Sequence, residues 1–126
     1  MNMKCLYAIP PESAREAHAI CENYSASLKE LSSNTVALAD DLRAFAESTG
    51  AAVLKLDDED WVVAQQGLEG NGAGALAGDL YWSKDAARRA QAALDGASDA
   101  NSSARALASW LANQVRRDRA VVLLAS

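Results

Sequence analysis

The sequence predicts an α+β fold: a small sheet, expected to be antiparallel, packed with an N-terminal helical hairpin and a C-terminal helix pair. Three observations carry this prediction. Short apolar runs stand near both ends of the chain, a long heptad-spaced stretch follows the first run, and two alanine-rich helical stretches precede the last. The alternative is a mainly α-helical fold that carries one β-hairpin. A chain of 126 residues is expected to form a single globular domain, 1–126.

The first element is expected to be a strand. Cys5–Ile9 is an apolar run too short for a helix, and Pro10 and Pro11 stop it. Proline is favoured in a first helical turn, and Ser13 and Glu16 have the spacing of a capping box. A helix is therefore predicted to begin here.

The stretch Ala14–Thr49 has two interleaved sets of residues seven apart, which alternate at three and four residues and form a heptad seam. One set is Ala17, Tyr24, Leu31, Leu38 and Phe45, and the other is Ala14, Cys21, Leu28, Thr35 and Leu42. Weak helix formers and cap formers interrupt the seam at Ser32–Thr35, and a hairpin would turn at Ser32–Asn34. Either one long helix or a hairpin of Ala14–Leu31 and Val36–Ser48 fits. A compact domain favours the hairpin, and Gly50 is expected to end it.

The middle of the chain is expected to hold a β-hairpin. The runs Ala52–Leu56 and Trp61–Gln65 are rich in strand-forming residues and flank an acidic turn, Asp57–Asp60. The glycine-rich segment Gly67–Gly78 is predicted to be a loop, and Asp79–Trp82 to add a further strand.

Two helices and a strand are expected at the end of the chain. Ser83 can cap a helix from Lys84 to about Leu94, and Ser102 or Ser103 starts another that reaches about Arg117. The inward stripes would be Ala86, Ala90, Ala93 and Leu94 in the first helix, and Ala104, Leu107, Ala108, Leu111 and Val115 in the second. Ala120–Leu124 reads as a buried strand whose natural neighbour is Cys5–Ile9.

Composition and charge narrow the class of protein. Lys plus Arg number 12 and Asp plus Glu 17, so the net charge is −5, which argues against direct nucleic-acid binding and against anionic membranes. No leader sequence or membrane-spanning run is evident, so a cytoplasmic location is expected. The alanine-rich composition is typical of a bacterial or phage protein. The two cysteines are too few for a secreted disulfide scaffold.

Chemistry-bearing motifs are sparse. His18, Cys21 and Glu22 share a helix face, but no second Cys or His lies within sequence reach to complete a zinc site. The glycine-rich segment lacks the Lys-Ser/Thr of a phosphate-binding loop. We therefore expect no metal, no cofactor and no catalytic residues, and a protein that is not an enzyme. The alternative is a small ligand-binding, acyl-binding or nucleotide-binding enzyme domain that uses the Gly67–Gly78 loop.

The expected function is protein–protein interaction by a small acidic protein. The partner-binding residues would be Asp57, Asp58, Glu59, Asp60 and Trp110, and the partner another protein with a basic surface. An inhibitor of a host nucleic-acid-binding defence complex, encoded by a phage or mobile element and of the anti-CRISPR type, fits this profile. A further alternative is a self-associating structural or adaptor protein, a homodimer through the Ala14–Thr49 heptad face.

Overall fold

A four-stranded antiparallel sheet forms the centre of the molecule, in the computed structural model, which describes residues 3–30, 35–74, 76, 79–97 and 102–125. The strands are β1 (Met3–Ile9), β2 (Ala52–Asp57), β3 (Tyr81–Trp82) and β4 (Ala120–Ala125), in the spatial order β2-β1-β4-β3. The predicted α+β class and antiparallel sheet are confirmed. The predicted neighbours also pair, since Cys5 lies opposite Leu124 and Ile9 opposite Ala120.

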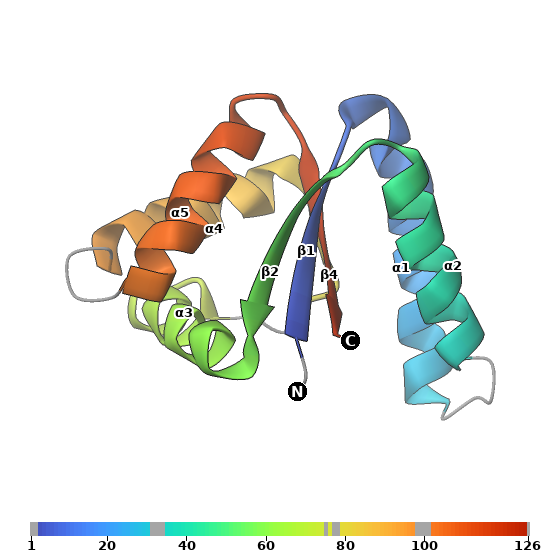
Figure 1. Ribbon diagram of the computed structural model, residues 1–126, viewed down its shortest axis with the longest axis horizontal. Helices are drawn as coiled ribbons and strands as arrows, with labels where there is room; N and C mark the ends of the chain where they lie inside the picture. The colour runs from blue at the N-terminus through green and yellow to red at the C-terminus, as the bar shows by residue number, and fades with distance from the viewer. Residues whose placement is uncertain (1–2, 31–34, 75, 77–78, 98–101, 126) are drawn as a thin grey trace.

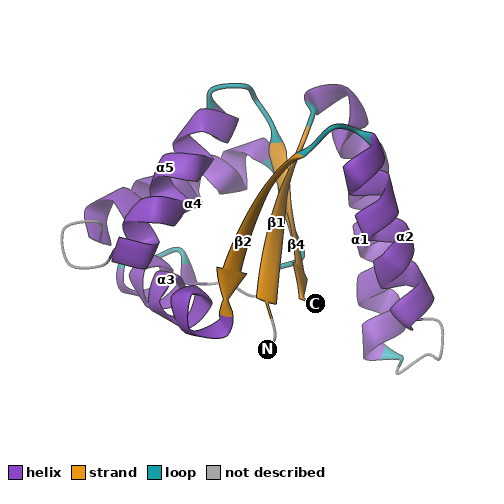
Figure 2. Cartoon of the chain, viewed as in Figure 1, coloured by secondary structure: helices purple, strands orange, loops and turns teal. Residues whose placement is uncertain are grey.

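Helices cover both faces of the sheet and give three layers (Figure 1). The hairpin of α1 (Ala14–Lys29) and α2 (Thr35–Ser48) packs on one face, after a short 3₁₀ turn at Pro11–Ser13. The other face carries α3 (Asp58–Gly70), α4 (Lys84–Ala97) and α5 (Ser102–Val115), as the colouring by secondary structure makes plain (Figure 2). None of the described helices is both long enough and apolar enough to cross a bilayer.

The strand pleat divides the apolar residues between two cores, because successive side chains point to opposite faces of a sheet. On β1, Cys5, Tyr7 and Ile9 face the α1/α2 hairpin, and Leu6 faces α3, α4 and α5. The hairpin side also buries Ala17, Cys21, Leu42, Ala46, Val122 and Leu124. The larger core is on the other side and includes Trp61, Leu68, Trp82, Leu94, Leu107, Leu111 and Val121.

The N-terminal helical hairpin is confirmed, and its predicted turn at Ser32–Asn34 lies outside the described residues. Two details of the prediction were wrong. The Ser13 side chain makes no capping hydrogen bond, because the chain enters α1 through the 3₁₀ turn. The heptad seam also does not persist to Leu28, which is 42% exposed. Gly50 ends the hairpin region with a left-handed φ of 74°, as expected of a helix C-terminal glycine.

The predicted β-hairpin was wrong in its second half. After β2 the chain enters α3 directly, so the run Trp61–Gln65 is helical rather than a strand. Trp61, Ala64 and Leu68 recur at three and four residues and are buried on one side of this helix, a spacing that suits a helix and not a strand. The helix also takes in Gly67–Gly70, so the predicted glycine loop begins only after Gly70.

The C-terminal helices and strand are confirmed, with boundaries shifted by a few residues. The Ser83 hydroxyl accepts a 3.2 Å hydrogen bond from the Ala86 backbone N–H and thereby caps α4. The helix runs to Ala97, beyond the predicted Leu94, and α5 ends at Val115 rather than at Arg117. The predicted stripes of both helices are buried, apart from Val115, which is half-buried.

Candidate functional site

The predicted acidic turn is the beginning of a helix. Asp57 is the N-cap residue of α3, and its carboxylate accepts a 2.7 Å hydrogen bond from the backbone N–H of Asp60. Asp58, Glu59 and Asp60 fill the first helical turn and are exposed. Carboxylates are favoured in this position because the free N–H groups and the helix dipole make it electropositive. The four predicted acidic residues therefore form one surface, but Asp57 has a structural task within it.

A second contact joins this first turn to a neighbouring helix. The Ser103 hydroxyl, in the first turn of α5, donates a 2.9 Å hydrogen bond to the Asp60 carboxylate. Asp57 and Asp60 thus contribute to the fold through their own hydrogen bonds. Asp58 and Glu59 have no such partner among the described residues, and both are exposed. They are the members of the predicted set that are available to a partner.

An apolar patch adjoins these two carboxylates. Val62 and Val63 follow one helical turn after Asp58 and Glu59, and the four side chains line one shallow depression of about 480 Å³. Val62 is 50% exposed, one of the few large apolar side chains among the described residues that faces solvent. We call this surface the α3 face, made of Asp58, Glu59, Val62 and Val63. An apolar centre with a charged rim is the arrangement found at protein–protein interfaces.

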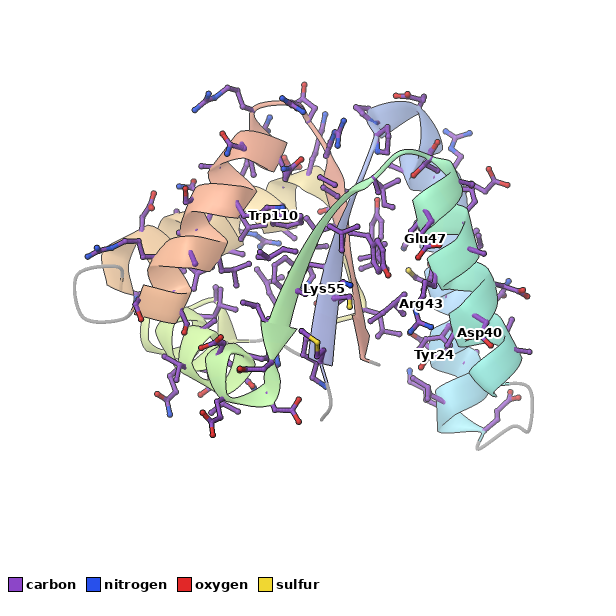
Figure 3. The ribbon with its side chains drawn as sticks, viewed as in Figure 1. Tyr24, Asp40, Arg43, Glu47, Lys55 and Trp110 are labelled. Atoms are coloured by element: carbon purple, nitrogen blue, oxygen red, sulfur yellow. The ribbon has the colours of Figure 1, made fainter. Side chains whose placement is uncertain are left out.

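Trp110 lies apart from the α3 face. It is half-buried on α5 and packs against the larger core. Its side chain points from α5 toward β2 (Figure 3). The structure therefore does not bring Trp110 together with Asp58 and Glu59 in one patch, and the predicted partner-binding residues divide into two surfaces.

The described start of the glycine-rich segment lies at the wrong end of a helix for a phosphate-binding loop. A phosphate cradle uses the positive N-terminal end of a helix, whereas Asn71 and Gly72 follow the C-terminal end of α3, which is electronegative. The Asn71 side-chain amide donates a 3.0 Å hydrogen bond to the Gly67 carbonyl, and Gly72 has a left-handed φ of 86°. These features terminate a helix. Residues 75, 77 and 78 of this predicted loop lie outside the described residues.

A hollow of about 380 Å³ lies between α1 and the β3 edge of the sheet. The His18 imidazole Nε2 is 3.2 Å from a Glu22 carboxylate oxygen, and the His18 ring packs against Tyr81 with 4.7 Å between ring centroids. Lys29 and Asp79 also line this hollow. His18 and Glu22 are exposed helix-surface residues, and the described residues include no cluster of three or more groups able to hold a metal ion.

Cys21 stands at the base of the same hollow but is buried. Burial raises the pKa of the Cys21 thiol to about 12, so the thiol stays protonated at neutral pH. A protonated thiol is a poor nucleophile and a poor metal ligand. His18, Cys21 and Glu22 therefore resemble an ordinary helix surface beside a core cysteine more than a catalytic site.

Sequence reasoning missed two of these arrangements. The apolar patch of Val62 and Val63 beside Asp58 and Glu59 was not predicted, because Val62 was expected to lie in a strand. The exposure of Val62 could not be predicted from the sequence. Sequence reasoning also missed the contact between His18 and Tyr81, which joins residues from two distant parts of the chain. The helical spacing of Trp61, Ala64 and Leu68 was a usable signal for α3.

Comparison with known proteins adds no relative: no protein-family model, no curated protein and no solved structure matches this chain.

Proposed function

We propose that the protein is a non-enzymatic protein-binding protein, and that the α3 face docks on a basic surface of its partner. The observation that carries the proposal is the exposed Val62, which lines the same shallow depression as Asp58 and Glu59. A partner side chain placed over Val62 would bury apolar surface, and arginine or lysine around it would meet the two carboxylates. Apolar anchors supply most of the affinity in such contacts, and charge complementarity sets orientation and speed of association.

The net charge of −5 also favours binding to a basic surface of a partner. An acidic protein approaches a basic surface faster than a neutral one, because long-range attraction steers the encounter. Proteins that bind nucleic acid present such basic grooves to phosphate groups. The inhibitor function expected from the sequence, competition with nucleic acid for the groove of a host defence complex, is one form of this proposal.

The test is an affinity purification with variants that leave the cap residue Asp57 intact. The tagged protein and its D58N/E59Q variant are incubated with lysate of a bacterial host, and the retained proteins are quantified by mass spectrometry. The matched control is E12Q/E16Q, which removes one exposed carboxylate from the 3₁₀ turn and one from the first turn of α1 instead. A third variant, V62S, removes the apolar centre without a change of charge.

The expected result is a partner retained by the wild type and by E12Q/E16Q, and lost with D58N/E59Q and with V62S. Its retention should also weaken as salt rises, since exposed charges are screened. Equal retention by all four proteins would refute the α3 face as the binding surface. Retention of no protein by the wild type at low salt would count against protein binding itself.

A further inference from the structure

One edge of the sheet is a long strand with no neighbour beyond it. Of the described strands, β2 pairs only with β1, whereas the opposite edge strand, β3, has just two residues. An edge strand presents unpaired backbone N–H and C=O groups that can pair with another chain. Val53 and Lys55 on this edge are exposed, and Val53 is 42% accessible. They lie opposite Tyr7 and Cys5, so they point to the α1/α2 side of the sheet.

We propose that β2 pairs in antiparallel fashion with β2 of a second copy, about a two-fold axis at Leu54, so that two sheets join into one of eight strands. Residues directly opposite each other in an antiparallel pair point to the same face. The axis must therefore pass through a residue, so that Val53 and Lys55 stay on one face and Leu54 on the other. This requirement leaves few registers.

The axis at Leu54 is the register that the side chains favour. It places Val53 of each copy opposite Lys55 of the other copy. The two strands then pair along Ala52–Leu56 of each copy. An axis at Lys55 would instead place two lysines directly opposite each other, which is destabilising. The long aliphatic part of a lysine can lie on an exposed valine while its ammonium stays in water.

Charge complementarity supports the second copy as the occupant. Two α2 side chains act on Tyr7: Arg43 makes a side-chain hydrogen bond to it, and the negative charge of Glu47 adds to the larger effect of burial in raising the pKa of Tyr7. Tyr7 is directly opposite Val53, so Glu47 stands above the strand next to the edge. Lys55 and Glu47 are exposed, and neither makes an ion pair with another described residue. In this register Lys55 of the second copy extends over Val53 toward Glu47.

The other face of the joined sheet gains apolar contact. Leu54 is half-buried at the edge of the larger core and would meet the same residue of the second copy at the axis. Trp110, half-buried in the same core, points from α5 toward β2 (Figure 3). This tryptophan would then border the junction between the copies. The interface is separate from the α3 face and does not depend on the proposed function.

The experiment is size-exclusion chromatography with light scattering on the full chain, whose single copy has a mass of 13.3 kDa. The wild type should show twice this mass at high concentration. V53K should show the mass of one copy, because the introduced lysine would lie opposite Lys55 of the second copy. V53K/K55E should regain the doubled mass, because opposite charges then face each other. V62K, which adds the same charge at another exposed valine, should remain a dimer.

A second measurement does not depend on how well the lysine variant folds. L54C should form a disulfide-linked dimer on mild oxidation, since Cβ atoms directly opposite in such a pair lie about 4.5–5.5 Å apart. V62C serves as the control and should stay unlinked. A single-copy mass for the wild type at its highest soluble concentration would overturn the proposal. A dimer that V53K and V62K leave equally intact, or that L54C does not trap, would overturn it as well.

Discussion

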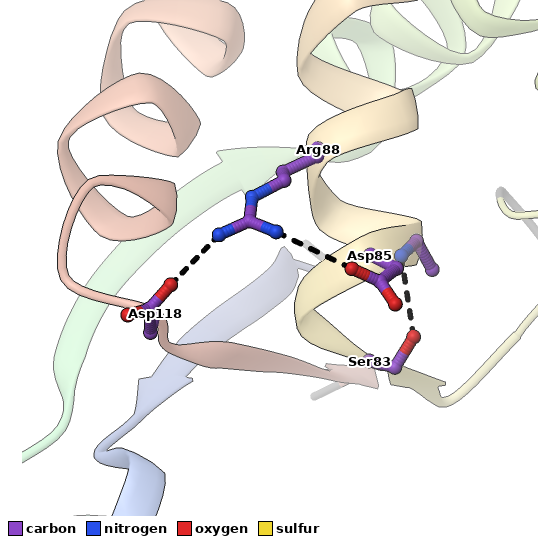
Figure 4. A network of polar contacts seen from close by, with 5 residues as sticks. Ser83, Asp85, Arg88 and Asp118 are labelled. Carbon is purple, nitrogen blue, oxygen red and sulfur yellow. Dashed lines mark hydrogen bonds and ion pairs between the residues drawn. The ribbon is translucent and has the colours of Figure 1, made fainter.

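The Arg88 guanidinium donates a 2.7 Å hydrogen bond to the Asp118 carboxylate, and so joins α4 to the turn between α5 and β4, 30 residues further along the chain. Arg88 also lies 3.3 Å from Asp85 on its own helix, where the Ser83 cap is close by (Figure 4). Asp118 has a left-handed φ of 56°, a conformation that aspartate tolerates better than most residues. The contact holds the chain at the point where it turns into the central strand β4.

Replacing Arg88 with alanine should therefore lower the free energy of unfolding only modestly, by about 0.2–1 kcal/mol, since both partners are about half-exposed. The loss should shrink as salt rises, because the attraction is screened. Urea unfolding of R88A, D118N and the double variant at two salt concentrations would measure the coupling. A loss that is independent of salt would show that packing of the arginine side chain matters more than its charge.

Asp57→Ala should cost more than Asp58→Ala, although the two residues are adjacent and both acidic. Asp57 caps α3 through its bond to the Asp60 N–H, and loss of such a cap costs about 1 kcal/mol. Asp58 makes no such bond among the described residues and contributes mainly through the helix dipole, at about 0.3–1 kcal/mol. Urea unfolding of both variants tests the ranking. Equal losses would mean that the side-chain cap contributes little.

Two glycine-to-alanine changes should have opposite signs. Gly50 has a φ of 74° and alanine there is strained whatever the space, so G50A should lose roughly 1–2 kcal/mol. Gly70 is the last residue of α3, and no described atom outside its own helix turn stands within 4 Å of where an added Cβ would lie, so G70A should gain less than about 1 kcal/mol, the value for a helix interior. Thermal unfolding of both variants distinguishes them. A gain in melting temperature for G50A would contradict the assigned backbone conformation.

The free energy of unfolding should fall at high pH, because the buried Cys21 thiol loses its proton more readily in the unfolded chain. Its pKa is raised to about 12 by burial, whereas an unfolded thiol titrates near its ordinary value of about 9, so the native state holds its proton more tightly. The stabilisation is therefore complete below about pH 9 and declines as pH rises toward 12. Between pH 8 and pH 10.5, the free energy of unfolding should fall more steeply for the wild type than for C21A. Equal falls in the two proteins would rule out this thiol as the cause.

A thiol reagent should also label native Cys21 slowly at pH 8.

The strands at the chain ends and the helical hairpin could be predicted because each rests on a local pattern. Cys5–Ile9 and Ala120–Leu124 are short apolar runs, and residues three or four apart, such as Ala17 and Cys21 on α1 and Leu42 and Ala46 on α2, are buried on each helix of the hairpin. The segment around Asp57–Asp60 was ambiguous, because acidic residues between apolar runs suit both a hairpin tip and a helix N-terminus. The hydrogen bond from the Asp60 N–H to Asp57 resolves it, and only the folded chain reveals that bond.

The candidate site was less predictable than the fold. The acidic cluster could be read from the sequence. Which of its carboxylates are engaged in hydrogen bonds within the fold could not, because the contacts of Asp57 and Asp60 form only in the folded chain. The exposure of Val62 follows from which side of α3 packs on the core. Trp110 was expected at an interface because of its place beside a helical stripe, and its half-buried packing against the larger core required the tertiary structure.

The two central strands of the sheet, β1 and β4, are the first and the last elements of the chain. A nascent chain in which Ala120–Ala125 is still inside the ribosome therefore lacks one of the two central strands, and β3 has no partner in the sheet until that strand is added. We expect a chain cut just before Ala120 to be protease-sensitive rather than a slightly smaller domain, because it lacks a central strand.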